Sequence, residues 1–473
     1  MTGKIALEEI SRLRPQLKEL ALNIWNDPEP PFHEKNAARW TAQMLSQAGF
    51  RVELGAAGLP TAIVATWGEG APVIGFLGEY DPLPGMSQTA DCAEKKPVVP
   101  GAYGHGCGHN LLGTANVGAV LGAKREMEAR GLGGTLVFYG CPAEELAAGK
   151  GIMAAAGLFD GLDACLVFHP DVRNVVQRGA NASCFSMKIA YHGRSAHAGG
   201  SPQDGRSALK AVELCGIGTQ YLREHLTADV RVHYCIDNGG TAMNIIPDYA
   251  QASYGVRANT VEAARDVKRR VLNVAQGAAL MTETTLEVED LSGCYDTLNN
   301  GVLGELMDRC LREVPFEPWT EEELCLAEKL NATNPRVYEG MCRRNGIEPG
   351  THLFTGVAPA NFAQEMASTD AGDVMHIVPG INFGTACAPI CAMPHTWQAT
   401  SAYGGEIGIK GMIYGAKAMA LCALRLMESP ETVQKAKEEF LNATGGVPYE
   451  CPMSAQDREN LLRQLAEATE VKG

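Results

Sequence analysis

The sequence has no block of basic residues, no long apolar run and no regular spacing of its cysteines. Its 40 Lys and Arg residues stand against 55 Asp and Glu residues, a net charge of −15, so a nucleic-acid partner would be repelled. The longest apolar runs, such as IVATW and LVFYG, are far shorter than the roughly 20 residues that cross a bilayer. We therefore expect neither a nucleic-acid partner nor a membrane partner.

The N-terminal segment and the cysteines indicate the compartment. The segment MTGKIALEEISRLRPQLKEL carries charges throughout and lacks the apolar stretch of a signal peptide. The 15 cysteines do not form a disulfide framework, and most are expected to be reduced and buried as small apolar side chains. Both features predict a cytoplasmic protein.

The composition is that of a globular protein, with 45% hydrophobic and 20% charged residues over 473 positions. This length predicts two domains, or one large α/β domain with an insertion. Apolar periodicity predicts helices over residues 5–25, 34–48 and about 111–130. The β-rich runs TAIVATW, PVIGFLGEY, GTLVFYG and DACLVFHP lie around the third helix and are apolar on both faces. They predict an α/β domain with a mostly parallel sheet and helices on both faces.

From residue 183 the pattern changes to strand, helix, strand, strand, helix and strand, which is the ferredoxin-like order. We therefore predict an inserted α+β domain over 183–294, with 1–182 and 295–473 forming the α/β domain. Within the latter part we expect helices at 302–313 and 405–427, a Gly/Pro/Asn-rich stretch at 331–362, a strand at GINFGTA and a polar helical tail after Glu428.

Polar clusters follow several of the predicted strands. Because ligands of parallel sheets bind beyond the carboxyl ends of the strands, these clusters are expected to converge. They are GEYD at 78–81, CPAEE at 141–145, FHP at 168–170 and APICAMPHTW ending at 397, with GHGCGHN at 104–110 in the loop before a helix.

Two of these clusters carry residue types suited to a metal site. Cys107 and His109 lie in a glycine-flanked loop, where both side chains can face one ion. Thiolate, imidazole and carboxylate donors suit Zn²⁺, with Mn²⁺ favoured where oxygen donors dominate. Of the adjacent carboxylates Glu144 and Glu145, one could bind metal while the other holds a water and moves its proton.

Each motif taken alone has a commoner explanation. A cysteine two residues from a histidine is more often a buried thiol beside a surface imidazole, and paired glutamates are usually a solvated helix start. His169 and His395 would alone be capping or loop histidines, and His197 an exposed loop histidine. Arg257 would be a surface charge on a strand, although it could pair with a substrate carboxylate.

In combination, the motifs resemble those of a known family. GHGCGHN, CPAEE, FHP, GRSAHAGGSP, GGTAMNIIP and MPHTW occur in the order found in the metallo-aminoacylase and glutamate-carboxypeptidase superfamily, peptidase family M20. The chain is most similar to the amidohydrolase branch, which includes hippurate and indole-acetyl-amino-acid hydrolases. GEYDPLPGMSQ, VFYGCPAEE and STDAGDV extend the resemblance over nearly the whole chain.

The resemblance implies two divalent metal ions, Mn or Zn, in the catalytic domain, and a dimerisation or lid role for 183–294. It also implies a role for each matching residue. The implied metal ligands are Cys107 (as the bridge), His109, Glu145, His169 and His395; Glu144 is the general acid/base, His197 is lent by a partner subunit to stabilise the oxyanion, and Asn244 and Arg257 hold the substrate carbonyl and carboxylate.

The implied reaction is hydrolysis of the amide bond of an N-acyl or N-aroyl amino acid, with p-aminobenzoyl-glutamate as the first candidate. The implied assembly is a homodimer, or a heteromer with a related subunit. Three alternatives stay open: an aminohydrolase that releases ammonia from an aromatic amine, a non-catalytic partner subunit, and a binding protein without a tight metal.

Two sites depart from the family pattern. Asn110 stands where many relatives have an aspartate, which would remove a carboxylate near the metals, and Leu146-Ala147-Ala148 replaces a common glycine pair. Asp370 and Asp373 are expected either to orient ligand imidazoles or to cap a helix.

Overall fold

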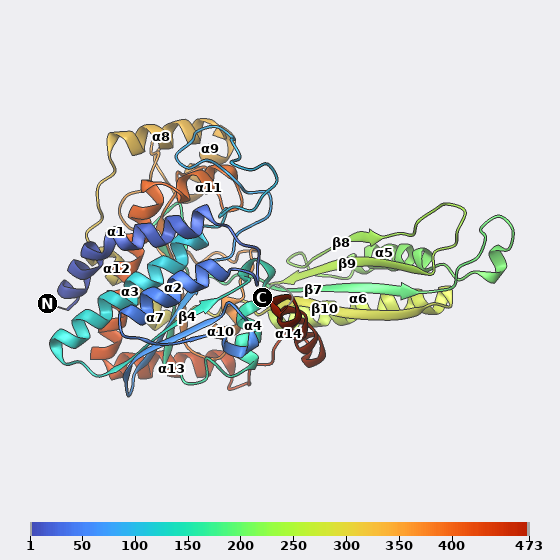
Figure 1. Ribbon diagram of the computed structural model, residues 1–473, viewed down its shortest axis with the longest axis horizontal. Coiled ribbons are helices and arrows are strands. Elements are labelled where there is room, and N and C mark those ends of the chain that lie inside the picture. Colours follow the sequence, from blue (N-terminus) through green and yellow to red (C-terminus); the bar gives the residue numbers. More distant parts are fainter. Residues whose placement is uncertain (1, 471–473) are drawn as a thin grey trace.

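The structure, a computed structural model, describes residues 2–470 and contains in them two β-sheets, one of seven strands and one of four (Figure 1). The larger sheet has the order β1-β2-β4-β3-β5-β11-β6. Its central strands β4, β3, β5 and β11 are parallel, which confirms the predicted fold class, while β1, β2 and β6 pair antiparallel. The strands are β1 (Arg51–Leu54), β2 (Ile63–Glu69), β3 (Val73–Glu79), β4 (Gly134–Cys141), β5 (Ala164–Asp171), β6 (Val175–Val176) and β11 (Gly380–Ala386).

Helices cover both faces of this sheet because its central strands are apolar on both sides. Phe138 in β4 packs on the face covered by α1, α3, α7 and α12, and its neighbour Val137 packs on the face covered by α4, α10 and α14. The bounds are α1 (Lys4–Asn26), α2 (Lys35–Gln47), α3 (His109–Arg130), α4 (Gly149–Ala155), α7 (Gly301–Glu313), α10 (Ala371–Met375), α11 (Trp397–Tyr403), α12 (Glu406–Glu428), α13 (Pro430–Thr444) and α14 (Ala455–Glu470).

The smaller sheet forms a domain that projects from the rest of the chain (Figure 1). Its order is β10-β7-β9-β8, all antiparallel, with α5 and α6 packed against it in the predicted ferredoxin-like sequence of elements. The division into 183–294 and the two flanking segments remains our proposal; it coincides with the first and last residues of this sheet. The elements are β7 (Ser183–His192), α5 (Ala208–Arg223), β8 (Arg231–Asn238), β9 (Tyr249–Ala258), α6 (Val261–Thr282) and β10 (Thr285–Cys294).

Strand β8 lies at one edge of the smaller sheet and pairs only with β9 among the described strands. Most of its side chains are exposed, and they include the apolar Tyr234 and Ile236, which are 36% and 43% exposed. An edge of this kind offers unpaired backbone groups together with apolar surface.

Helices α8 and α9 are among those that fall where no element was predicted. Helix α8 (Glu321–Ala332) begins with a capping box formed by Thr320 and Glu323. Helix α9 (Pro335–Asn345) lies inside the Gly/Pro/Asn-rich stretch at 331–362. There Asn334 caps the helix, Pro335 occupies its first turn and Gly346 ends it at a φ of 62°, so residues that suggest a loop are in fact the start and stop signals of a helix.

Helix α12 is long and apolar enough to cross a membrane by length and composition alone. In the structure 94% of its apolar window is buried against α1, α3, α7 and the sheet. This burial is that of a core helix.

Candidate metal centre

The polar clusters at the strand ends lie together at one edge of the larger sheet. Glu79 ends β3, the turn η2 (Glu144–Leu146) follows β4, and His169 lies near the end of β5. Cys107 and His109 come from the loop that opens α3, and His395 from the loop between β11 and α11. Glu79, Cys107, Glu144, Glu145, His169 and His395 line a cavity of about 470 Å³.

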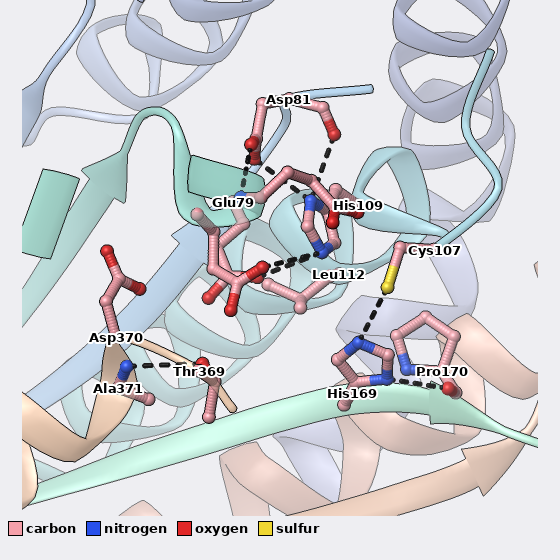
Figure 2. A network of polar contacts seen from close by, with 12 residues as sticks. Glu79, Asp81, Cys107, His109, Leu112, His169, Pro170, Thr369, Asp370 and Ala371 are labelled. Carbon is pink, nitrogen blue, oxygen red and sulfur yellow. Dashed lines mark hydrogen bonds and ion pairs between the residues drawn. The ribbon is translucent and has the colours of Figure 1, made fainter. Parts of the chain in front are cut away.

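Cys107, His109 and His169 form one group of possible metal donors. One donor atom from each lies within 4.8 Å of the other two. The sulfur of Cys107 is 3.3 Å from Nε2 of His169, and Figure 2 shows His109 directed toward the same space from above.

Cys107, Glu145 and His395 form a second group with the same spacing. Nε2 of His395 is 3.4 Å from Oε2 of Glu145. Since Cys107 belongs to both groups, its sulfur is placed where it could bridge two ions. The structure thus brings together all five side chains that the sequence suggested as ligands.

His109 is oriented by a carboxylate that was not singled out as a site residue. Its Nδ1 lies 3.0 Å from Oδ1 of Asp81, at the end of the GEYD motif, and the whole imidazole is buried (Figure 2). This contact directs Nε2 of His109 toward Glu79, 3.3 Å away, and Glu144, 3.7 Å away. Asp81 also accepts a hydrogen bond from the backbone of Glu145 at 2.8 Å, so one carboxylate fixes two of the possible ligands.

Two buried atoms in this cluster lack a hydrogen-bond partner among the described residues: Nε2 of His109 and Oε1 of Glu145. Buried polar atoms are normally satisfied, so such a pair calls for an explanation. Sulfur, nitrogen and carboxylate donors within a few ångströms are the donor set of zinc or manganese. The residues present therefore fit divalent ions.

Glu144 lies in the cavity wall beside this cluster. Burial and the nearby carboxylate of Glu79 raise the pKa of Glu144 well above its ordinary value, although His109 opposes the shift. Burial likewise raises the pKa of Glu145, against the opposing charge of His109. Several carboxylates are thus crowded into a buried space, an arrangement that cations would relieve.

The backbone around the two glutamates is constrained. Ala143 and Ala147, on either side of η2, have φ values of 56° and 51°, and His395 has a φ of 65°. Left-handed backbone at residues other than glycine is uncommon and gathers at functional sites, where the surrounding structure holds it. At His395 its own N–H donates to the carbonyl of Gly106 at 2.8 Å, which ties this loop to the Cys107 loop.

Arg257 reaches the same cavity from the inserted domain. It lies on β9, and its Nη1 donates to the carbonyl of Met366 at 3.0 Å and to the hydroxyl of Ser368 at 3.3 Å. These contacts hold the guanidinium at the cavity wall, where it could meet an anionic group of a ligand.

His197 and Asn244 lie elsewhere in the same chain. They belong to the loops after β7 and β8, which are neighbours because Ala198 donates to the carbonyl of Asn244 at 3.0 Å. Both loops are at the far tip of the inserted domain in Figure 1. The ten residues of β7 separate that tip from the cavity, about 30 Å at roughly 3.3 Å per residue. A single chain therefore does not bring these two residues to the cluster.

Asp370 is the N-cap residue of α10, as one expectation allowed, and the described contacts of Asp370 and Asp373 include no imidazole of the cluster. Asp370 accepts hydrogen bonds from Nζ and the backbone of Lys150 and makes no side-chain cap, and Asp373 accepts from the hydroxyl of Tyr449. Lys150 is fully buried and also donates to Glu79 at 2.6 Å. The imidazole-orienting role falls to Asp81 instead.

The expectation for Asn110 also needs correction. Its amide nitrogen donates to the carbonyls of Ala21 and Tyr403, so the side chain joins α3 to α1 and to the end of α11. It faces the packed helices behind the cluster, so an asparagine here ties helices together.

A projecting ferredoxin-like domain inserted into an α/β domain, with paired donor groups at the strand ends, defines a class of two-domain metallohydrolases. The sequence model of the peptidase dimerisation domain of the M20 family matches residues 180–303. The chain is 38% identical to one of the subunits of p-aminobenzoyl-glutamate hydrolase of Escherichia coli over 93% of its own length and 95% of that protein. It is 29% identical to the Xaa-Arg dipeptidase of Mus musculus, covering 92% and 91% of the two chains.

The solved structures agree on the fold. An aminobenzoyl-glutamate utilization protein from Klebsiella pneumoniae superposes with a TM-score of 0.61 at 18% identity, covering 88% of this chain and 97% of that one. A dinuclear metal-binding peptidase from Bacillus subtilis superposes with a TM-score of 0.58 at 19% identity, covering 89% and 99%. The chain belongs to peptidase family M20, and it is a hydrolase of that family that acts on amide bonds.

Proposed function

We propose that the chain hydrolyses N-aroyl or N-acyl amino acids that carry a free carboxylate, with p-aminobenzoyl-glutamate as the first substrate to test. One observation carries the proposal. Two groups of metal donors meet at Cys107, and the guanidinium of Arg257 lines the same cavity. The 38% identical relative is named for hydrolysis of p-aminobenzoyl-glutamate, which supports this substrate.

The proposed cofactors are two divalent ions, manganese or zinc, held by two donor groups that meet at Cys107. When bound, such ions polarise the scissile carbonyl and lower the pKa of water. Cys107, His109 and His169 would hold one ion, and Cys107, Glu145 and His395 the other.

The residues around the ions would perform the proton transfers and the substrate binding. Glu144 takes the proton of the attacking water and later delivers it to the departing amine nitrogen. Arg257 pairs with the free carboxylate and so places the amide bond against the donor cluster. The position of Glu144 in the cavity wall, beside the donor cluster, supports this role.

His197 and Asn244 are proposed to act from a partner subunit, His197 on the oxyanion and Asn244 on the substrate carbonyl. Their place at the domain tip, about 30 Å along β7 from their own cavity, supports a shared site. The exposed edge of β8, with Tyr234 and Ile236, supports pairing with a second copy.

The proposed assembly is a homodimer, and a related protein is the alternative partner. Two Escherichia coli relatives are named as two different subunits of p-aminobenzoyl-glutamate hydrolase, which supports that alternative. We also propose a cytoplasmic location, which the 15 free cysteines of the described chain support.

The test is a substrate panel on protein with a measured metal content. p-Aminobenzoyl-glutamate, hippurate and acetylated amino acids are compared with the same compounds whose free carboxylates are converted to amides, with manganese or zinc added. We expect release of the amino acid from the free acids and a much higher KM for the amides. In Arg257→Ala this difference between acid and amide should largely disappear.

Release of ammonia without an amino acid would replace the proposal with the aminohydrolase alternative. Purified protein that binds no metal and cleaves nothing would instead identify a non-catalytic subunit, and addition of a related protein would then be the next step. Equal rates on acids and amides would overturn the role of Arg257 while leaving the hydrolase assignment intact.

A further inference from the structure

Three side chains form a row across the base of the inserted domain: Cys294 on β10, Cys184 on β7 and Arg257 on β9. Cys184 is the register partner of both of its neighbours. Directly opposed residues of antiparallel strands point to the same face, so the row places two thiols beside the arginine of the substrate cavity.

The two thiols are close enough to react with each other. Their sulfur atoms lie 3.4 Å apart. Opposed residues in an antiparallel pair have Cα atoms about 4.5 to 5.5 Å apart, and disulfides span about 4.4 to 6.8 Å, so a bond needs side-chain rotation but no backbone movement. The strands at this point are already fixed, since the hydroxyl of Ser183 donates to the carbonyl of Cys294 at 2.7 Å.

Cys184 is also reachable and activated. It lines the cavity that holds the metal donor cluster, and its side chain keeps a small exposed area, whereas Cys294 is fully buried behind it. The hydrogen bond with Cys294 and the positive charge of Arg257 lower the pKa of Cys184, and the pKa of Cys294 is raised correspondingly. A small oxidant that enters the cavity therefore meets the more acidic thiol first.

We propose that Cys184 and Cys294 are a redox modification site, a thiol pair in the cavity wall that hydrogen peroxide converts to a disulfide. The Cys184 thiolate sulfur attacks peroxide, so that an S–O bond forms, the O–O bond breaks and hydroxide leaves. The Cys294 sulfur then displaces hydroxide from the resulting sulfenic acid, and its proton leaves with that hydroxide as water. Overall, two thiols and one peroxide give one disulfide and two waters.

The location gives this bond a consequence for the fold. The chain enters the inserted domain at β7 and leaves it at the end of β10, and Cys184 and Cys294 lie at these two crossings. A disulfide would link the two strands at the neck of the domain. The disulfide would also remove the ionisable thiol of Cys184 that lies beside Arg257.

The experiment treats the metal-loaded protein with a low molar excess of hydrogen peroxide, blocks the remaining thiols under denaturing conditions and maps the peptides without reduction. We expect a cross-linked peptide that joins Cys184 to Cys294 and disappears after dithiothreitol. In Cys294→Ser we expect Cys184 to stop at the sulfenic acid, which a 1,3-dione reagent traps. Neither readout depends on catalytic activity.

A matched control lies within the chain. Cys310 and Cys422 also contact each other, but both are fully buried in the core and line none of the cavities described. Cys310 and Cys422 should stay reduced during the peroxide treatment and so be recovered as alkylated cysteines, while Cys184 and Cys294 are recovered as a disulfide. The proposal is overturned if Cys184 and Cys294 stay as thiols when the exposed Cys235 is oxidised, or if the Cys310–Cys422 pair forms a disulfide at the same rate.

Discussion

Asp81 lies 3.0 Å from Nδ1 of His109 and thereby turns the opposite ring nitrogen toward the donor cluster. The same carboxylate accepts the backbone N–H of Glu145 at 2.8 Å. One buried side chain thus positions a proposed ligand of each ion, and substitutions that keep its shape should show how far the metal centre depends on it.

Replacement of Asp81 by asparagine should weaken metal binding by about ten- to a hundredfold, because the amide cannot accept from both partners as the carboxylate does. Competition with a chelator, followed by metal analysis, measures the affinity. Since asparagine has nearly the same shape, circular dichroism and melting of the metal-saturated protein should change little. Unchanged metal affinity in Asp81→Asn would contradict the positioning role.

The neighbours Glu144 and Glu145 should respond differently to the same substitution. Glu144→Gln should keep its full metal content and lose at least about a hundredfold in kcat, since it removes the proton carrier alone. Glu145→Gln should lower the metal content first, because one proposed ligand is lost. If both variants lose metal equally, or Glu144→Gln retains its turnover, the division of roles between them is wrong.

Mixed dimers test whether the site is shared. His197→Ala and Glu144→Gln should each be nearly inactive alone. When the two are mixed and allowed to exchange, half of the dimers should carry one intact site, and activity should return to about a quarter of the wild-type value. Persistent inactivity after demonstrated subunit exchange would mean that His197 does not act across an interface.

Glu34 provides a pH-dependent prediction away from the donor cluster. Its carboxyl is buried at the start of α2 and accepts from the N–H groups of Phe32 and Ala143 and from the hydroxyl of Thr61. Burial, with a further contribution from the charge of Asp81, raises the pKa of Glu34 from 4.5 to about 8. The folded protein therefore holds a proton that the unfolded chain releases at lower pH.

The direction in which stability changes with pH follows from this difference in the pKa of Glu34 between the folded and unfolded states. Between about pH 4.5 and 8 the folded state binds more protons at Glu34 than the unfolded state, so stability falls as the pH rises through this range. In Glu34→Gln the amide oxygen can accept both N–H groups and its nitrogen can donate to Thr61. We expect the Tm of Glu34→Gln minus that of the wild type, at constant metal, to increase from pH 5 to about pH 8. A constant difference would show that Glu34 is ionised in the folded protein.

The sequence was sufficient for the features that depend on local pattern. The apolar strand runs gave the parallel centre of the larger sheet, and the change of rhythm at residue 183 gave the inserted domain. The five possible ligands were named because the motifs that contain them, each at a strand end or helix start, together resemble those of the family. Their convergence follows from parallel topology, which is why it could be anticipated.

The parts that were missed depend on tertiary contacts. The roles of Asp81 and Lys150 come from partners on other elements, although the GEYD motif that contains Asp81 was among the clusters expected to converge. Asn110 was misjudged because its position next to His109 suggested the metal centre, whereas helix geometry turns its side chain toward α1. The contact of Asp370 with Lys150 was missed because the two residues are far apart in the sequence.

The place of β8 at the edge of its sheet has a consequence for handling the protein. A chain kept from assembling would present an open row of backbone donors and acceptors flanked by Tyr234 and Ile236. Such a surface recruits any extended strand it meets, its own copies included. Isolated protomers should therefore aggregate at concentrations at which protomers paired through β8 stay in solution. Charged side chains introduced along β8 should reduce this aggregation.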